Sequence, residues 1–171
     1  LVKALNAAKK QTDIYLLAHL AEGLGNIYCI EGKYAKAMRL YHYGLEVSSK
    51  QHLPGYYMQD SVAQIYKDWG QLDQALEAAK RNVTVKENLG LTEALPFAYS
   101  QLGYVYLETG NIDPASDYFR RGLEVARKGN GDRHFQILNH CFLGWCRFLQ
   151  NSRIEGRVLA EEAFEEAKKQ G

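Results

Sequence analysis

The feature that most constrains the fold of this chain is an internal repeat. Four segments of the 171-residue sequence align with one another, beginning at Leu24, Val62, Leu102 and Leu143, which lie 38, 40 and 41 residues apart. The first and third segments both end in Gly-Leu-Glu-Val. A register that is kept over four segments indicates a repeat architecture, in which each unit buries its apolar face against its neighbours.

Each repeat is predicted to form two α-helices joined by a turn. In the first half of repeat one, Leu17, Ala21, Leu24 and Tyr28 recur at steps of four and three residues, which is the spacing of one helix face. A turn residue follows at the same place in all four repeats: Gly32, Gly70, Gly110 and Asn151. Glycine and asparagine tolerate the left-handed conformation that commonly ends a helix. No segment alternates with period two, so no strand is expected.

The second helix of each repeat has start signals of its own. Asp113 followed by Pro114 predicts an N-cap and a first helical residue. Ser152 and Glu155 have the spacing of a capping box. A small residue, which predicts close approach of the paired helix, stands at the same place in all four second helices: Ala37, Ala75, Ala115 and Gly156.

These signals predict an all-α chain that forms one domain over residues 1–171, in keeping with its length. The four helical hairpins are expected at residues 13–51, 55–89, 92–129 and 132–170. Residues 1–11 resemble the end of a preceding second helix. Because the sequence begins with leucine inside a repeat, we expect it to be a fragment of a larger protein.

The repeat pattern Leu-Gly-x-x-Tyr-x-x-x-Gly-x-[Tyr/Ile]-x-x-Ala-x-x-x-[Tyr/Phe] resembles the tetratricopeptide repeat. Repeat one matches it with Leu24, Gly25, Tyr28, Gly32, Tyr34, Ala37 and Tyr41, and repeat three with Leu102, Gly103, Tyr106, Gly110, Ile112, Ala115 and Phe119. Repeat two departs at Ala63 and Ala79, and repeat four at Arg147, Arg153 and Gly156. The period near 40 is similar to the long-helix subclass of kinesin light chains, spindle adaptor proteins and sensor arms of bacterial transcription regulators.

The resemblance implies a right-handed α-α superhelix, a solenoid of four hairpins plus the partial N-terminal helix, whose concave face is lined by the first helices. It further implies a protein-interaction module, part of a scaffold or regulatory protein, that binds a peptide or partner segment in this groove. The predicted groove residues form one stripe per first helix: His19, Glu22, Asn26 and Cys29; Tyr57, Asp60, Gln64 and Lys67; Phe97, Ser100, Tyr104 and Leu107; Leu138, Cys141, Trp145 and Phe148.

Two parts of this stripe allow alternative interpretations. The amides of Asn26 and Gln64 can hydrogen-bond the backbone of an extended peptide, or they can simply keep an exposed helix face soluble. Trp145 and Phe148 can form a pocket for an anchor residue of a partner, or they can be covered by further chain or pack within their own repeat. A carboxylate clamp of the type that holds chaperone C-termini is rejected, because Glu22 and Asp60 would repel the ligand.

The apolar C-terminal end of the stripe also permits a different class of function. Exposed ends of a solenoid can stack on each other, so a homo-oligomerising structural element is the alternative to a peptide-binding module. The mass of the chain in solution over a range of concentrations distinguishes the two.

Composition excludes several partner classes. Lys plus Arg is 21 and Asp plus Glu is 20, and this net charge of +1 gives no basic excess for nucleic acid. The longest apolar run, residues 14–18, is far shorter than the ~20 residues of a membrane span. The three cysteines, Cys29, Cys141 and Cys146, do not form a disulfide framework, which favours a reducing compartment and a cytoplasmic protein.

Catalytic and metal-binding patterns are weak. Gly23-Leu24-Gly25 lies within a predicted helix, follows no strand and lacks the third glycine of a dinucleotide fingerprint. His134, His140, Cys141 and Cys146 do not share one helical face, so no metal site is predicted. We therefore expect no enzyme activity, no cofactor and no metal.

Overall fold

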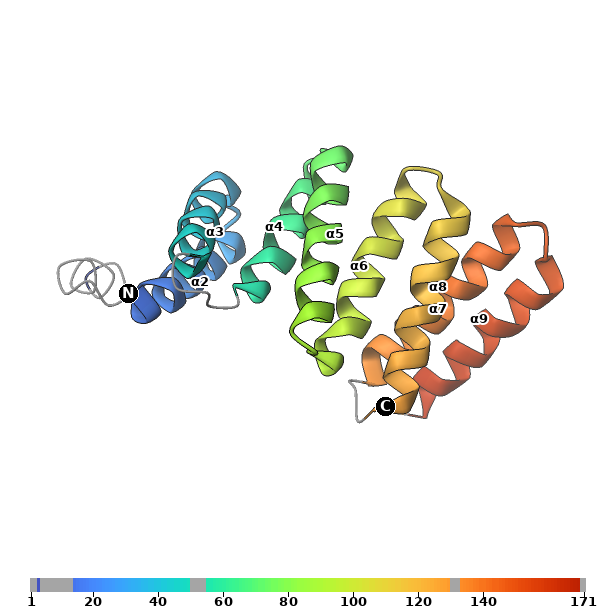
Figure 1. Cartoon of the computed structure of the whole chain (residues 1–171). Helices are drawn as coiled ribbons and strands as arrows, with labels where there is room; N and C mark the ends of the chain where they lie inside the picture. Colours follow the sequence, from blue (N-terminus) through green and yellow to red (C-terminus); the bar gives the residue numbers. More distant parts are fainter. Residues whose placement is uncertain (1–2, 4–13, 50–54, 130–132, 170–171) are drawn as a thin grey trace. The chain divides into compact units, whose positions relative to one another are not determined.

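The described part of the chain consists of helices joined by short turns (Figure 1). The structure is a computed structural model that describes residue 3 and residues 14–49, 55–129 and 133–169. Its elements are α2 (Ile14–Ile30), α3 (Tyr34–Ser49), α4 (Tyr56–Asp68), α5 (Leu72–Asn88), the 3-10 helix η1 (Thr92–Ala94), α6 (Leu95–Glu108), α7 (Ile112–Lys128), α8 (Arg133–Leu149) and α9 (Arg153–Lys168). No strand occurs among these residues, and the all-α prediction is confirmed. The predicted helix within residues 1–11 lies outside the described residues, apart from residue 3.

The chain divides between Gln71 and Leu72 into two compact units. Unit 1 contains α2, α3 and α4, and unit 2 contains α5 to α9. The division falls inside the predicted second repeat, 55–89. Each unit is therefore described by itself, and the organisation of the whole chain as one domain stays a prediction.

The four predicted turn residues all adopt the left-handed conformation. Their φ angles are 71° at Gly32, 70° at Gly70, 75° at Gly110 and 66° at Asn151. Each turn is closed by the same pair of backbone hydrogen bonds; at Gly110, its own N–H donates to Leu107 O and that of Asn111 to Tyr106 O. These bonds satisfy carbonyl groups that the end of a helix leaves without partners.

The predicted starts of the second helices agree less well with the structure than the predicted turns do. Helix α7 begins at Ile112 with Asn111 as its N-cap, so the assignment of Asp113 as the cap is wrong. The first helical bond runs from Ala115 N–H to Asn111 O, and Pro114 lies within the first turn, where its missing N–H costs nothing. Ser152 is the N-cap of α9 as predicted, but its side chain makes no capping hydrogen bond.

In unit 1, α2 and α3 meet where a glycine faces an aromatic ring. A Cβ on Gly25 would lie 2.5 Å from Cε1 of Tyr41, so only glycine fits beside this ring. The predicted small residue Ala37 is fully buried in the same pair. The α2–α3 pair is thus held by ring-to-backbone packing at the positions that the repeat pattern singled out.

Unit 2 repeats this arrangement in α6 and α7. A Cβ on Gly103 would lie 2.9 Å from Cε1 of Phe119, and Phe119 and Ala115 are both fully buried. The Phe119 ring stacks on Phe142 of α8 at 5.0 Å between centroids and 16° between planes. One aromatic ring therefore connects the α6–α7 pair to the helix that follows it.

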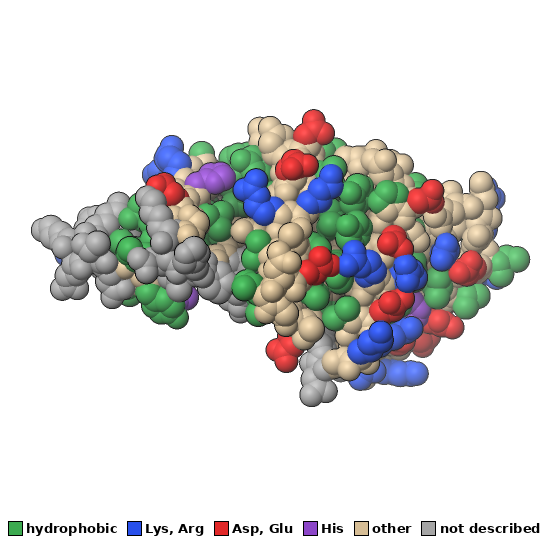
Figure 2. Space-filling model, in the orientation of Figure 1, with side chains coloured by type: hydrophobic (Ala, Val, Ile, Leu, Met, Phe, Trp, Pro, Cys, Tyr) green, Lys and Arg blue, Asp and Glu red, His purple; other side chains and the backbone are tan. Residues whose placement is uncertain are grey.

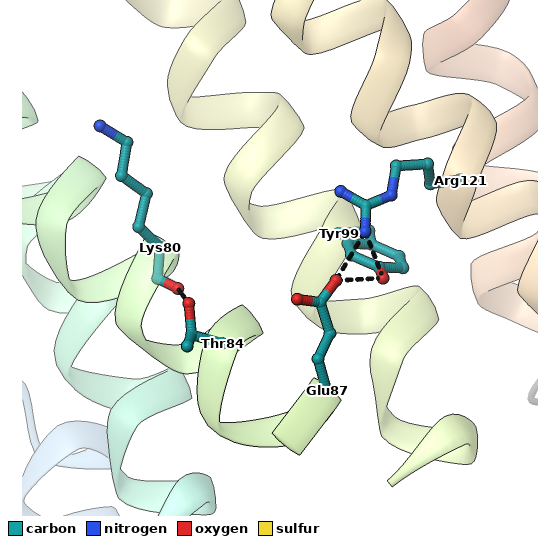
Figure 3. Close-up of polar contacts among 5 residues, drawn as sticks. All are labelled: Lys80, Thr84, Glu87, Tyr99 and Arg121. Atoms are coloured by element: carbon teal, nitrogen blue, oxygen red, sulfur yellow. Dashed lines mark hydrogen bonds and ion pairs between the residues drawn. The ribbon is translucent and has the colours of Figure 1, made fainter. Parts of the chain in front are cut away.

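Polar contacts join three helices of unit 2 (Figure 3). Tyr99 of α6 donates a hydrogen bond to Glu87 Oε1 of α5 over 2.7 Å. Arg121 of α7 donates to the same oxygen over 2.6 Å and to the Tyr99 hydroxyl over 3.0 Å. Its guanidinium lies 4.5 Å from the centroid of the Tyr99 ring, a cation–π contact. These contacts connect α5, α6 and α7 within this unit.

Candidate functional site

The α8–α9 pair of unit 2 exposes two large aromatic side chains on neighbouring turns of α8. Trp145 is 50% exposed and Phe148 is 43% exposed. Their rings are stacked, with 5.9 Å between centroids and 7° between planes. The structure therefore does not support the interpretation that the rings of Trp145 and Phe148 are packed within their own repeat.

A pocket of about 400 Å³ opens beside these rings, between α8 and α9. It is lined by Cys141, Gly144, Trp145, Phe148, Arg153, Ile154, Gly156, Arg157 and Ala160. The guanidinium of Arg153 lies 5.8 Å from the centroid of the Phe148 ring. The pocket thus combines aromatic and aliphatic walls with two guanidinium groups.

A second pocket of about 340 Å³ adjoins the first along the same helix pair. It is lined by His134, Ile137, Leu138, Cys141, Ala160, Ala163, Phe164 and Ala167. Cys141 and Ala160 border both pockets, so the two are continuous in their lining. Phe164 is 61% exposed. We call the two pockets, their lining residues included, the α8–α9 surface.

Close backbone contact between α8 and α9 shapes this surface. A Cβ on Gly156 would lie 2.6 Å from Gly144 O and 2.6 Å from Phe148 N. A Cβ on Gly144 would lie 2.8 Å from Gly156 O. The two helices cross backbone to backbone here, and no ring stands between them as it does in α2–α3 and α6–α7.

The predicted groove residues of α6 lie against neighbouring parts of unit 2. Phe97 contacts Phe135 of α8 at 4.9 Å between ring centroids, and Tyr104 contacts Phe142 at 5.4 Å. Leu107 packs against the core cluster of unit 2. Ser100 is buried and donates a hydrogen bond to Pro96 O over 2.9 Å. The role of these α6 residues in binding a partner stays a prediction.

In unit 1, the predicted groove residues of α2 are partly engaged with α3. Tyr41 donates a hydrogen bond to Asn26 Oδ1 over 2.6 Å, and Cys29 Sγ lies 3.4 Å from the same hydroxyl. Burial raises the pKa of the Glu22 carboxyl, while nearby His19 opposes that rise. The Asn26 amide therefore supports α2–α3 packing, and its contact with a peptide stays a prediction.

The predicted groove residues of α4 are also in contact with their own helix. Gln64 donates a hydrogen bond to Asp68 over 2.7 Å, and Lys67 Nζ lies 3.3 Å from the same carboxylate. Asp60 is buried. The side chain of Tyr57 lies outside the described residues. A binding role for these four also stays a prediction.

The sequence reasoning missed several residues of the α8–α9 surface, all in α9: Arg153, Ile154, Arg157, Ala160 and Phe164. The signal that could have found them is Ala160, which stands where repeats one and three have the aromatic residues Tyr41 and Phe119. Repeat two also has alanine at this place, and Ala79 is fully buried, so the missing ring alone does not predict a pocket.

Charges on the described surface are mixed. Figure 2 shows basic and acidic side chains interspersed over the part of unit 2 that faces the viewer.

No described helix is both long and apolar enough to cross a membrane. Among the described residues, no group of three or more His, Cys, Asp and Glu side chains could hold a metal ion. Burial raises the pKa of the Cys146 thiol to about 11, which keeps it protonated in the core.

Comparison with known families identifies one repeat of the chain. Residues 98–136, which comprise most of α6, all of α7 and the start of α8, match the tetratricopeptide repeat family. This part of unit 2 is therefore similar to a tetratricopeptide repeat. Its assignment to the subclass with a period near 40 stays a prediction. No curated protein matches the sequence.

Several solved structures share the fold at low sequence identity. BtubC (BKLC) from P. vanneervenii superposes with a TM-score of 0.84 at 17% identity, covering 92% of this chain and 65% of that one. Nearly identical repeats of a putative kinesin light chain from Podospora anserina give 0.71 at 17%, over 91% and 77%. The Sgt2 tetratricopeptide repeat domain from Aspergillus fumigatus gives 0.62 at 19%, over 78% and 79%. The fold class, an α-α superhelix, is confirmed by this likeness.

Proposed function

We propose that this chain is a protein-interaction module whose α8–α9 surface receives an apolar segment of a partner protein. Tetratricopeptide repeats generally mediate protein–protein interaction, which supports the class of function. The observation that carries the choice of site is the stacked, half-exposed pair of Trp145 and Phe148 beside an open pocket.

The physical reason lies in what exposed aromatic rings contribute when they are covered. Apolar area removed from water contributes roughly 25 cal/mol per Å². Trp and Arg are enriched among the few interface residues that dominate binding, and such residues cluster in pockets from which water is excluded. Trp145, Phe148 and Arg153 provide this combination at one pocket. A partner that buries the two rings would gain most of its affinity there.

We further propose that the first-helix amides of unit 1, Asn26 and Gln64, contact a bound peptide, as the groove prediction requires. The Asn26 amide nitrogen and the remaining acceptor capacity of both amides can serve a peptide backbone. A scaffold or regulatory role, a cytoplasmic location and the lack of catalytic activity belong to the same proposal. The exposed thiol of Cys141 is compatible with a reducing compartment.

The test uses the whole chain as bait, together with two variants of it. Trp145→Ser with Phe148→Ser should lose the captured partner, while far-UV circular dichroism stays at the wild-type value. Trp69→Ser is the matched control, since Trp69 of unit 1 is 43% exposed but lies outside the α8–α9 surface. The captured protein is then purified and titrated against each variant by calorimetry. Binding that is unchanged in the double variant would contradict the proposed site.

Self-association is the alternative, and the same exposed surface favours it. Monomers rarely expose large contiguous apolar patches, and a second copy can cover such a patch as well as a partner can. Sedimentation equilibrium over a wide concentration range decides between the two. A mass that doubles in the wild type and stays monomeric in Trp145→Ser/Phe148→Ser would identify the structural element rather than the partner-binding module.

A further inference from the structure

A buried histidine lies between α8 and α9. The side chain of His140, in the middle of α8, is 2% exposed. Its Nε2 atom lies 3.5 Å from Glu162 Oε2, and its Nδ1 atom lies 3.8 Å from Glu166 Oε1. Both carboxylates belong to α9. Because histidine is the side chain whose charge ordinarily changes between pH 5 and 8, the strength of this contact depends on pH.

A neutral imidazole cannot donate to both carboxylates at once. The neutral ring carries one N–H group, whereas the protonated ring carries two. Within the part of the chain that the structure describes, His140 Nδ1 and Glu166 Oε2 are buried atoms that have no hydrogen-bond partner. Such atoms cost stability. Protonation places an N–H on each nitrogen, and a movement of about 1 Å brings either carboxylate to hydrogen-bond distance.

Repeat three has a residue at the same place that does not change its charge in this pH range. Repeats three and four align at an offset of 41 residues, which pairs His140 with Tyr99. Tyr99 lies between Glu87 of α5 and Arg121 of α7 (Figure 3). Burial, followed by the bond to Glu87, raises the pKa of Tyr99 to about 12. A contact that is independent of pH in repeat three therefore becomes dependent on pH in repeat four.

The charges on either side of this place are exchanged between the two repeats. Glu162 of α9 stands where α7 has Arg121. Repeats two and three align at an offset of 40 residues, so Arg127 of α7 stands where α5 has Glu87. The later helix thus presents a cation to Tyr99 but an anion to its counterpart in α8. A positive charge at that place in α8 pairs with the anion, and protonated histidine provides it.

The other helices around His140 contribute few charges. Helix α7 ends in Arg127 and Lys128, which are both exposed, so water screens their charges. Helix α6 has one acidic or basic residue, Glu108, at its last position. In α8 itself, no acidic residue, basic residue or other histidine lies within five residues of His140. The two carboxylates of α9 are therefore the nearest charges, and they favour the protonated ring, whereas burial by itself favours the neutral one.

We propose that His140 forms a proton-dependent contact that holds α9 against α8, in which the protonated imidazole binds Glu162 and Glu166. Folding then takes up a proton. The stability that this contact contributes is complete in mildly acidic solution and is lost as pH rises through the histidine range. The inference goes beyond the proposed function and does not depend on it, because it concerns the pairing of two helices within unit 2.

The test compares thermal unfolding of the whole chain at pH 5.5 and pH 8, in the wild type and in His140→Gln. Glutamate ordinarily stays ionised over this range while histidine titrates. When the pH is lowered, the melting temperature of the wild type should rise relative to that of the variant. We expect a relative rise of about 2–4 °C, the usual effect of one net hydrogen bond in a chain of this size.

Variants of the two carboxylates keep the test valid if His140→Gln fails to fold. Glu162→Gln and Glu166→Gln change partly exposed residues and keep the side-chain size, so each should reduce the pH dependence, and the two together should abolish it. His42→Gln, at an exposed histidine of α3, is the matched control and should leave the pH dependence unchanged. Hydrogen exchange of α9 amides, compared between variants at one pH, should locate the effect in α9.

Three outcomes would overturn the inference. The first is an equal response of the wild type and His140→Gln to pH. The second is a wild type that loses stability on acidification relative to the variant, which would mean that burial outweighs the two carboxylates. The third is a pH dependence that persists in the double variant of Glu162 and Glu166. None of them bears on binding through Trp145 and Phe148, so the proposed function is tested separately.

Discussion

Arg121 donates a hydrogen bond to Glu87 over 2.6 Å, and this contact joins α7 to α5 across the tyrosine-bearing face of α6. The two side chains are 36% and 37% exposed, so water screens the pair and its own contribution is about 0–1 kcal/mol. Its larger effect is on Tyr99, whose hydroxyl lies between the two charged groups. The contact therefore adds two opposing influences to the pKa of a tyrosine that burial already raises.

The first prediction concerns pH. Burial, followed by the hydrogen bond to Glu87, raises the pKa of Tyr99 to about 12, while Arg121 opposes the rise. Tyr99 stays protonated in the folded chain after it has ionised in the unfolded chain, so its stabilising contribution is complete below about pH 10 and is lost as pH rises toward 12. Urea denaturation of the wild type and Tyr99→Phe at pH 9 and pH 11 should show a smaller alkaline loss in the variant. Tyr15→Phe, at an exposed tyrosine, is the control.

The second prediction concerns the helix crossing in unit 2. Gly103→Leu should lower the free energy of unfolding by about 1–3 kcal/mol, because its side chain would overlap the Phe119 ring, which Phe142 holds from the other side. Chemical denaturation measures the change. Glu108→Leu on the exposed face of the same helix is the control and should alter stability by less than about 0.5 kcal/mol. Equal stability of the two variants would mean that the α6–α7 crossing is misplaced.

The third prediction concerns the last turn. Asn151 has φ 66°, in the left-handed region that other side chains adopt at a cost of about 1–2 kcal/mol. Asn151→Ala should therefore lower the melting temperature, and Asn151→Gly should match or exceed the wild type. Differential scanning calorimetry is the measurement, with Gly110→Ala as a reference for the same change in repeat three. Stability of Asn151→Ala equal to that of Asn151→Gly would contradict the turn geometry.

The fourth prediction concerns the amides of Asn26 and Gln64, for which the sequence predicts the same role in binding a peptide backbone. Asn26→Ala should destabilise unit 1 by about 0.5–1.5 kcal/mol, because the buried Tyr41 hydroxyl loses its 2.6 Å acceptor. Gln64→Ala should cost far less, since its one described bond goes to exposed Asp68 on the same helix. Hydrogen exchange of α2 and α3 amides reports the difference. Similar protection in both variants would show that the Asn26 contact is not formed in solution.

Local sequence was sufficient for the helices and their turns. Apolar residues at steps of three and four determine which face of each helix is buried. The first helices end at residues with a left-handed backbone conformation, which depends only on the residue itself and its immediate neighbours: Gly32, Gly70, Gly110 and Asn151. The facing glycine and ring at Gly103 and Phe119 follow from the same repeat pattern. These features depend on neighbours that are close in sequence or repeated with a fixed period.

The binding surface depended on tertiary structure. Tyr104 and Trp145 stand at corresponding places in the predicted stripe of first-helix residues. The stripe did not show that Phe142 of α8 contacts Tyr104, whereas Trp145 stays half exposed. Nor did the stripe show that the Asn26 amide oxygen accepts a hydrogen bond from the Tyr41 hydroxyl. The sequence by itself determined the repeats and the helices, because these follow from periodicity. Tertiary structure alone decided which apolar residues are covered, because exposure depends on which helix lies against each one.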